Sequence, residues 1–562
     1  MSWLLGNFGN ENIRSCCPES PEVVVEKPGF CLYAGGNPRT FTKHQLPNGD
    51  QVLVLGYPVY FDGNQYVNLT PDKLLDLMKL TDPTESLDGH YLILRIRGRE
   101  IDVFNDKLGK RSLYIYQHGN RTLFTTHIAI LRKAVNPELD FHKLGPLWHT
   151  RYPTGSGKYC PSLDSYYRHT TMLGTGSKAT LKNGKVEIVN HPFHPDSNKG
   201  DIFPMIESFC LSTPKSRLPI AISLSGGMDI RSLLAVFLKA KVNTFAVHYG
   251  REDTSDYHIA RKISEDNGIA FRHIGFKEAE GNDPWQQVID YMQTLGLVAN
   301  PVEAPYIGFY KEIARESDLI VSGYFGSLYR IRIYVTHLLN WLNHKQLKTA
   351  DLHALLRLEP PPIFQPDCIK ELNQGYRECI ESVYELLNNH RDLNNLLLLD
   401  LLLAGHSPAS MIQNTLTFLD QHIVDHMPWL QSRILSQHWH YGLAYQFMEG
   451  IHRDLIKRNW PSLAKYPIAL YDIQAPYNYQ AYMVKVKSWY IHRFKPVQTE
   501  DRVIRLLTIN RESILDLFNS KRVRDYAPYR LGYIEKSIEE FYKGERRKAP
   551  VLMSWLSVEL GR

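Results

Sequence analysis

Short apolar segments alternate with polar turn residues over roughly the first 195 positions, a pattern typical of antiparallel strands. Asn183-Gly184 separates two further strand-like segments and predicts a two-residue hairpin. The turn-rich stretch 191–198 predicts a linker after this region. We therefore predict a β-rich domain over residues 1–196, with its clearest strands at 51–57, 91–97, 101–104, 112–117 and 122–126.

The pattern changes beyond the linker, where short apolar segments alternate with stretches of helical periodicity. Strands that alternate with helices predict a parallel sheet with crossover helices. After about residue 338 the pattern is mostly helical. The fold class is thus α/β, with a second domain over 197–562. Its expected strands are 220–224, 243–249, 269–274 and 318–322, and its expected helices are 230–240, 255–267 and 305–316.

Composition narrows the class of protein. The chain has 562 residues, of which 43% are hydrophobic and 22% charged, so disordered and fibrous classes are excluded. The net charge of +6 is mild, and the basic stretches 521–524 and 546–548 are more typical of a solvated surface than of a nucleic-acid contact. Seven cysteines without a CxxC pair favour a reducing compartment.

Membrane and export signals are weak in this sequence. The longest apolar run, 396–404, is interrupted by Asp400 and is too short to span a bilayer. The first nine residues lack the basic and apolar regions of a signal peptide. We therefore expect a soluble, cytoplasmic protein without a membrane partner.

The strongest chemical signal lies in residues 219–231. An apolar strand ends in Ser225-Gly226-Gly227, which opens a helix. Two glycines allow a ligand to approach the backbone closely, and a helix N-terminus favours a phosphate or pyrophosphate. Asp229 is a candidate ligand for the magnesium ion that accompanies a nucleotide. An ordinary strand-to-helix turn with a capping serine is the alternative.

The same segment resembles the pyrophosphate loop SGGxDS of the N-type ATP pyrophosphatases, which cleave ATP between its α and β phosphates. The sequence departs from this pattern at Ile230, where the family has a serine, so one hydroxyl contact to pyrophosphate is missing. Further segments resemble the asparagine synthetase branch, which includes the β-lactam synthetases and lasso-peptide cyclases. Their order along the chain carries this resemblance: 87–91, 105–116, 124–127, 173–174, 255–260 and 418–420.

The resemblance implies an N-terminal Ntn-hydrolase-like β-sandwich, which is the glutaminase domain in that family. It also implies a C-terminal parallel-sheet synthetase domain of the adenine-nucleotide α-hydrolase-like type. Family members that hydrolyse glutamine carry a cysteine after the initiator methionine, whereas this chain begins Met1-Ser2-Trp3. The segment 56–61 also lacks the family's glutamate. We therefore expect the first domain to be structural, without the thiolate nucleophile.

A second family motif, close to sGxGaDExfgGY, corresponds to residues 321–330, and Ser327 replaces its acidic residue. Arg330 or Arg332 is a candidate to neutralise phosphate instead, although a surface arginine is the commoner case. The family also uses a lysine that stabilises the transition state. Lys485 is our candidate for it, although Lys457 and Lys487 lie in equally unconvincing contexts.

The resemblance implies an ATP-dependent ligase that adenylates a carboxylate and couples it to ammonia or an amine, with Mg²⁺ as the metal. Asp229 and Lys485 are its predicted catalytic residues, and Asp229 is its predicted metal ligand. A small molecule or peptide with a carboxylate is the expected substrate, in bacterial natural-product or polysaccharide biosynthesis. A partner protein that delivers substrate, and a homodimer, stay open. The predicted ATP and pyrophosphate contacts are Ser223, Ser225, Gly226, Gly227, Met228, Asp229, Ile230, Val247, Gly323 and Tyr324.

Two other functions compete with this prediction. The losses at Ile230 and Ser327 favour a weakly catalytic nucleotide-binding scaffold or sensor. A tRNA-modifying pyrophosphatase is permitted by the mild basicity, but the glutaminase-like domain argues against it. The stretch 154–158 lacks the spacing of a Walker A loop, and His422 with His426 does not suffice for zinc.

Overall fold

The structure is a computed structural model of the chain. It describes all residues except 1, 19–20, 152–159, 161, 163, 192, 196–197, 215, 331–347, 390–394, 408–411, 471–472 and 479–499. Lys485, Lys487, Arg332 and the Walker-like stretch 154–158 lie outside the described residues, as do position 338 and the predicted domain boundary at 196/197.

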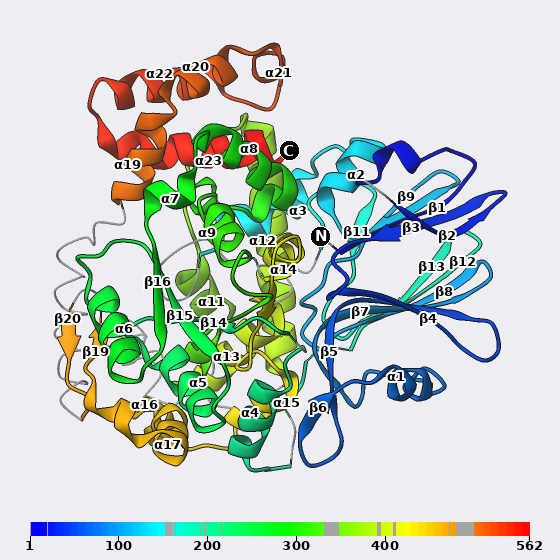
Figure 1. The fold of residues 1–562 in the computed structure, drawn as a ribbon. Coiled ribbons are helices and arrows are strands. Elements are labelled where there is room, and N and C mark those ends of the chain that lie inside the picture. Colours follow the sequence, from blue (N-terminus) through cyan, green and yellow to red (C-terminus); the bar gives the residue numbers. More distant parts are fainter. Residues whose placement is uncertain are drawn as a thin grey trace.

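Two antiparallel sheets form the N-terminal part, at the right of Figure 1. The first has the strand order β11-β9-β10-β1-β3-β2, and the second has the order β13-β12-β8-β7-β5-β4 with β6 paired to β5. Their bounds are β1 (Trp3–Phe8), β2 (Glu22–Lys27), β3 (Phe30–Gly35), β4 (Phe41–Gln45), β5 (Gln51–Phe61), β6 (Tyr66–Asn68), β7 (Leu87–Arg97), β8 (Glu100–Asn105), β9 (Tyr114–His118), β10 (Arg121–Thr125), β11 (Thr170–Met172), β12 (Lys178–Lys182) and β13 (Lys185–Val189).

Apolar residues from both sheets share one core, so the sheets pack face to face as a sandwich. Leu92 and Leu94 of β7 point into this core, whereas Tyr91 and Ile93 point to the opposite face. Helix α1 (Pro71–Leu77) covers that opposite face through Leu74 and Leu77. The period of two along β7 therefore places both faces of the second sheet in apolar surroundings.

The predicted strands of this part agree closely with β5, β7, β8, β9 and β10. Asn183-Gly184 joins β12 to β13, and both residues have positive φ angles of 50° and 81°. This conformation is the one that favours Asn-Gly in a tight hairpin, which confirms the predicted turn. The sequence pattern did not identify six strands of this part: β1, β2, β3, β4, β6 and β11.

A five-stranded parallel sheet forms the centre of the second part, with the order β16-β15-β14-β17-β18. Four strands match the predicted positions: β14 (Ile220–Ser223), β15 (Thr244–Tyr249), β16 (Ala270–Ile274) and β17 (Leu319–Val321). The fifth strand, β18 (Val424–His426), lies in the region predicted to be mostly helical. Sandwich plus parallel sheet confirms the predicted α/β class (Figure 1).

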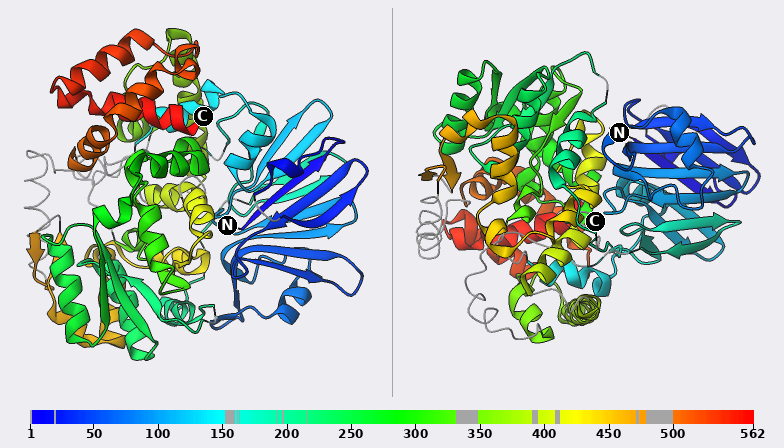
Figure 2. Two further views of the ribbon diagram at one scale, coloured as in Figure 1. Left: turned by 45° about the horizontal axis from the view of Figure 1, so that its top comes forward. Right: turned by 90° about the horizontal axis from the view of Figure 1, so that it is seen from below.

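Helices surround the parallel sheet, and α19 to α23 form one end of the molecule (Figures 1 and 2). The helices after α1 in the described part of the chain are α2 (Ile128–Val135), α3 (Phe141–His149), α4 (Ile202–Leu211), α5 (Met228–Lys239), α6 (Ser255–Asp266), α7 (Phe276–Glu280), α8 (Pro284–Leu295), α9 (Tyr306–Ile313), α11 (Thr349–Leu356), α12 (Pro366–Asn388), α13 (Asn395–Ser407), α14 (Gln413–Leu419), α15 (Ser432–His438), α16 (Leu443–Phe447), α17 (Gly450–Asn459), α19 (Glu500–Ile509), α20 (Arg511–Asn519), α21 (Lys521–Arg524), α22 (Leu531–Tyr542) and α23 (Ala549–Gly561). A short hairpin, β19 (Ile468–Leu470) and β20 (Ile473–Ala475), follows α17.

Buried polar contacts join the sandwich to the second part. Arg111 forms a two-pronged ion pair with Asp420, in which Nη2 lies 3.0 Å from Oδ1. His90 Nδ1 lies 2.7 Å from the same guanidinium. Asp88 accepts hydrogen bonds from the Ser432 amide and hydroxyl at 2.9 and 2.6 Å. Two segments that carry the family resemblance, 105–116 and 418–420, therefore meet at this interface.

All seven cysteine thiols are free. Among the described helices, none combines the length and hydrophobicity that a membrane span requires.

Candidate functional site

The Ser-Gly-Gly loop connects the carboxyl end of β14 to the start of α5, as predicted. Gly227 is the N-cap of α5, with φ −76° and ψ 170°. Its amide donates a hydrogen bond to the Ser225 hydroxyl at 3.2 Å. The loop thus presents a tight turn and a helix N-terminus together, which is the arrangement that favours phosphate.

Gly226 is held firmly from the protein side of the loop. Its amide donates to Asp256 Oδ1 of α6 at 2.7 Å, and its carbonyl accepts from Arg231 Nη2 at 2.8 Å. The Ala469 amide of β19 also donates to that carbonyl at 3.1 Å. A Cβ atom on Gly226 would lie 2.6 Å from the Ala469 Cβ, so packing alone requires glycine at this position.

Arg231 anchors the loop to the segment before β19. The side chain is fully buried and also donates to the carbonyl oxygens of Tyr466 and Pro467, at 3.0 and 2.6 Å. Burial lowers the pKa of this guanidinium to about 10. The group remains protonated at neutral pH, and its charge is directed at backbone carbonyls rather than at the outer side of the loop.

A second glycine-bearing loop, residues 322–326 after β17, packs directly on the first. A Cβ on Gly323 would lie 3.1 Å from the Ile230 amide nitrogen, and one on Gly326 would lie 2.6 Å from the Asp229 Cβ. These close approaches bring the predicted residues Asp229, Ile230 and Gly323 together. Tyr324, next to them, is exposed.

Three groups converge on the Asp229 side chain and backbone. Arg330 Nη2 lies 3.0 Å from Oδ2, and His452 Nε2 lies 3.3 Å from Oδ1. The indole N–H of Trp429 donates to the Asp229 carbonyl at 2.9 Å. Burial would raise the pKa of the Asp229 carboxyl, but Arg330 and then His452 outweigh it and hold the pKa below its ordinary value. Asp229 is therefore an ionised, ion-paired carboxylate.

The remaining predicted contacts divide between the surface and the core. Ser223 and Val247 pair in register across β14 and β15, and the Val247 side chain is fully buried. Met228 and Ile230 are buried as well, so Ile230 fills the core where the family has a hydroxyl. Ser223, Ser225 and Gly227 are half-buried at the edge of the site.

Magnesium does not fit the arrangement around Asp229. Mg²⁺ requires near-octahedral oxygen ligands, usually one or two carboxylates with waters and phosphates. Here Arg330 and His452 already contact both oxygens of the one predicted ligand. Within the described part of the chain, no group of three or more His, Cys, Asp or Glu side chains is placed to hold a metal. ATP fits better, because the N-terminus of α5 suits a phosphate without any metal ligand.

Arg330, one of the two arginines that we considered as a candidate to neutralise phosphate, donates to the Asp229 carboxylate. His452, Trp429 and Glu449, which also belong to this cluster, were missed. They lie far from Asp229 in the chain and in no recognisable motif. Of the residues around Asp229, only Arg330 could be found from the sequence, because it follows the second glycine loop closely.

Ser2, which stands where glutamine-hydrolysing family members have cysteine, directly precedes β1 and lies next to Thr40. Ser2 is buried, and its hydroxyl lies 2.5 Å from the hydroxyl of Thr40. A second hydroxyl is not a general base, so this contact does not activate Ser2 as a nucleophile.

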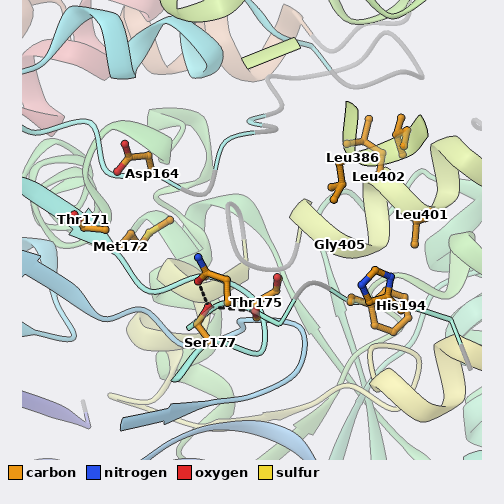
Figure 3. A pocket seen from close by; sticks show the side chains of 14 residues that line it. Asp164, Thr171, Met172, Thr175, Ser177, His194, Leu386, Leu401, Leu402 and Gly405 are labelled. Atoms are coloured by element: carbon orange, nitrogen blue, oxygen red, sulfur yellow. Dashed lines mark hydrogen bonds between the residues drawn. The ribbon is translucent and has the colours of Figure 1, made fainter. Parts of the chain in front are cut away.

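A cavity of about 390 Å³ lies away from the Ser-Gly-Gly loop (Figure 3). Its polar wall comes from the sandwich side, where the Ser177 hydroxyl donates to Asn190 Oδ1 at 2.7 Å and to the Thr175 carbonyl at 3.2 Å. Its apolar wall comes from α12 and α13. None of its lining residues was predicted as a site residue: Asp164, Thr171, Met172, Gly174, Thr175, Ser177, Asn190, Phe193, His194, Leu386, Leu387, Leu401, Leu402 and Gly405.

Comparison with known families supports the predicted resemblance. The asparagine synthase family model matches residues 212–327, which contain both glycine-bearing loops and end before Arg330. This segment is asparagine synthase-like, and the match indicates ATP-dependent, ligase-type chemistry at the level of the family. No curated protein matches the chain.

Among solved structures, the chain is similar to glutamine phosphoribosylpyrophosphate amidotransferase from B. subtilis in complex with ADP and GMP. The identity is 12% and the TM-score 0.21, over 48% of this chain and 65% of that one. It is also similar to a structure described as the allosteric regulatory enzyme of purine biosynthesis, with 11% identity and a TM-score of 0.22, over 48% of this chain and 64% of that one. The chain thus spans less than two thirds of either, and scores this low carry no functional argument.

Proposed function

We propose that this asparagine synthetase-like chain is an ATP-dependent, AMP-forming amide ligase whose nucleotide binds at the Ser-Gly-Gly loop. A carboxylate oxygen of the acyl substrate attacks the α-phosphorus, the bond to the bridging oxygen breaks, and pyrophosphate leaves. Ammonia or an amine then attacks the acyl carbon, AMP leaves, and the nitrogen loses a proton. The first turn of α5 would bind and orient the phosphates.

Gly227 is the observation that carries this proposal. Packing explains the other glycines nearby, because a Cβ on Gly226 or Gly326 would lie 2.6 Å from a neighbouring Cβ. At Gly227 the nearest atom within 4 Å would be the Ser225 hydroxyl oxygen at 3.3 Å, which a small side-chain rotation relieves. Its φ of −76° also suits any residue. Glycine is itself an accepted N-cap residue, and close approach of a ligand to the backbone is a second physical reason for it there.

The same position allows a sharp test, because aspartate and asparagine are both favoured N-cap residues. Gly227→Asp would preserve α5 while it places a carboxylate where the phosphate is proposed to bind. Gly227→Asn, of the same shape without the charge, is the matched control. We expect calorimetric titration with ATP to show a loss of affinity of at least about tenfold for Gly227→Asp relative to Gly227→Asn.

Equal affinities for these two variants would contradict a phosphate site at the loop. If Gly227→Asp does lose affinity, the next assay measures pyrophosphate release in the presence of added carboxylates. Release that depends on one of them would identify the acyl substrate. If the wild-type chain binds no ATP at all, the ligase proposal is refuted.

The source of the amine depends on the N-terminal domain. We propose that this domain lacks glutaminase activity, because Ser2 replaces the cysteine. The one hydrogen bond described for the Ser2 side chain is to the Thr40 hydroxyl. Glutamate released from glutamine by the purified chain would contradict this proposal. In a chain without glutaminase activity, the nitrogen comes from free ammonia or from an amine group on a second substrate. A small-molecule or peptide carboxylate, a delivering partner protein, a homodimer and a cytoplasmic site of action remain parts of the proposal that rest on the family resemblance.

A second candidate is a nucleotide-binding scaffold with weakened catalysis. The ion pair with Arg330 and the contact with His452 favour it, because they occupy the carboxylate that the family resemblance assigns to the metal. ATP binding without pyrophosphate release across a panel of carboxylates would support the scaffold over the ligase.

A further inference from the structure

Arg330 bridges two carboxylates at the predicted nucleotide site. It ends the short 3-10 helix Gly326–Tyr329, directly after the second glycine loop. Its Nη2 lies 3.0 Å from Asp229 Oδ2 and its Nη1 lies 3.0 Å from Glu449 Oε1. One guanidinium therefore links the first turn of α5 to the residue that precedes α17.

Glu449 has an unusual environment for a charged residue. Its side chain is 1% exposed, and its backbone has φ 54° and ψ 36°, a left-handed conformation that few residues other than glycine adopt. Uncommon backbone conformations of this kind persist where the surrounding structure holds them and concentrate at functional sites. The ion pair with Arg330 supplies a compensating charge for this buried carboxylate.

His452 lies one helical turn from Glu449 and completes the surroundings of Asp229. The imidazole is fully buried, and its ring centre lies 4.7 Å from that of Trp429, whose indole N–H bonds the Asp229 carbonyl. Arg330, His452 and Trp429 thus fix the position of Asp229 from three sides. α17 also packs along α5, so both carboxylates are carried by elements in direct contact.

A dication at Asp229 would compete with the Arg330 guanidinium, which is already paired with Asp229 and Glu449. To bind Asp229, it would have to displace Arg330, and the buried Glu449 would lose that ion pair. An arginine cannot lose its proton to make room electrostatically. The residues present therefore provide a permanent cation where the family resemblance calls for a metal.

We propose that Arg330 is a built-in cation that takes the place of the divalent metal, so that this chain binds a nucleoside triphosphate without metal. The nucleotide part rests on the proposed function, whereas the exclusion of metal from Asp229 stands on the ion pairs alone. Arg330 is a positioning residue in this scheme: it holds Asp229 and Glu449 in place beside the loop.

The first experiment uses the wild-type chain with ATP, titrated once in EDTA and once in excess Mg²⁺. We expect dissociation constants that agree within about threefold. Binding that requires Mg²⁺ would overturn the inference and leave the proposed nucleotide site standing. Absence of ATP binding in both buffers would overturn the proposed function, and the metal measurement below would then decide the inference.

The second experiment measures Mn²⁺ binding by electron paramagnetic resonance, which needs no nucleotide. We expect no Mn²⁺ site at Asp229 in the wild-type chain, a new one in Arg330→Gln, and its loss in Arg330→Gln with Asp229→Asn. Arg315→Gln, which removes an exposed arginine paired with Glu312, is the matched control and should gain no site. If the wild-type chain binds Mn²⁺ and Asp229→Asn abolishes this binding, the inference is refuted. This comparison does not need the Arg330→Gln variant, so it holds even if that variant fails to fold.

Discussion

Asp425 should make the native state less stable as the pH rises, and Asp425→Asn should remove this dependence. The residue lies in β18, 1% exposed, beside β17. Neither carboxylate oxygen makes a hydrogen bond of normal geometry to a described residue. Burial raises the pKa of this carboxyl from 3.8 to about 7, and the nearby Ser322 hydroxyl offsets only part of the effect.

The sign follows from where the proton is held. Between pH 3.8 and about 7 the native state keeps the proton on Asp425 while the unfolded chain loses it, so stability falls as the pH rises through this window. At about 1.36 kcal/mol for each pKa unit, the cost is roughly 4 kcal/mol at pH 8 and roughly 2 kcal/mol at pH 5. Asparagine carries no such cost, and any loss from its buried amide group is the same at both pH values.

Urea unfolding at the two pH values, followed by tryptophan fluorescence, measures this difference. The free energy of unfolding of Asp425→Asn relative to wild type should be about 2 to 3 kcal/mol more favourable at pH 8 than at pH 5. The comparison uses the unfolding transition of the parallel-sheet part, because a chain of this size need not unfold in one step. A variant effect that is equal at both pH values would show that Asp425 ionises normally in the native protein.

Two further predictions concern packing and the interface. Arg111→Met should destabilise the chain by about 3 to 5 kcal/mol in urea unfolding, because it leaves the buried Asp420 without its partner, and Arg111→Met with Asp420→Leu should recover part of the loss. Arg261→Met, which breaks an exposed pair with Glu265, should cost no more than about 1 kcal/mol, and an equal loss would contradict the argument. Gly326→Ala should cost about 1 to 3 kcal/mol because its Cβ would lie 2.6 Å from that of Asp229. Gly532→Ala, in the open on α22, should instead stabilise the chain in the same thermal or urea assay.

The sheets were predictable where local patterns decide the structure. Asn183-Gly184 specifies its own hairpin through backbone conformation, and the strands from 220 to 321 alternate with amphipathic helices at the expected spacing. β18 escaped prediction because it has three residues, two of them polar, and follows a helix. Its place in the sheet depends on pairing with β17, about a hundred residues earlier in the chain, which no local pattern reveals.

The candidate site shows the same limit more sharply. Ser225, Gly226 and Gly227 are adjacent, so the turn and the helix N-terminus could be predicted together. The surroundings of Asp229 come from Arg330, Glu449 and His452, which only the folded chain brings together. A metal role for Asp229 was inferred from the motif, whereas its contacts are determined by residues outside the motif.

Retained glycines are therefore weaker evidence for nucleotide chemistry than the motif suggests. Gly226, Gly323 and Gly326 have a packing reason in this fold, since Ala469, Ile230 and Asp229 occupy the space a side chain would need. A chain that had lost ATP binding would still need glycine at those positions. Gly227 differs because its surroundings and its backbone conformation leave room for a side chain. Asparagine or aspartate would cap α5 at this position at least as well as glycine does. The proposed nucleotide site thus depends on Gly227, whereas the proposed absence of metal depends on Arg330, and each can fail without the other.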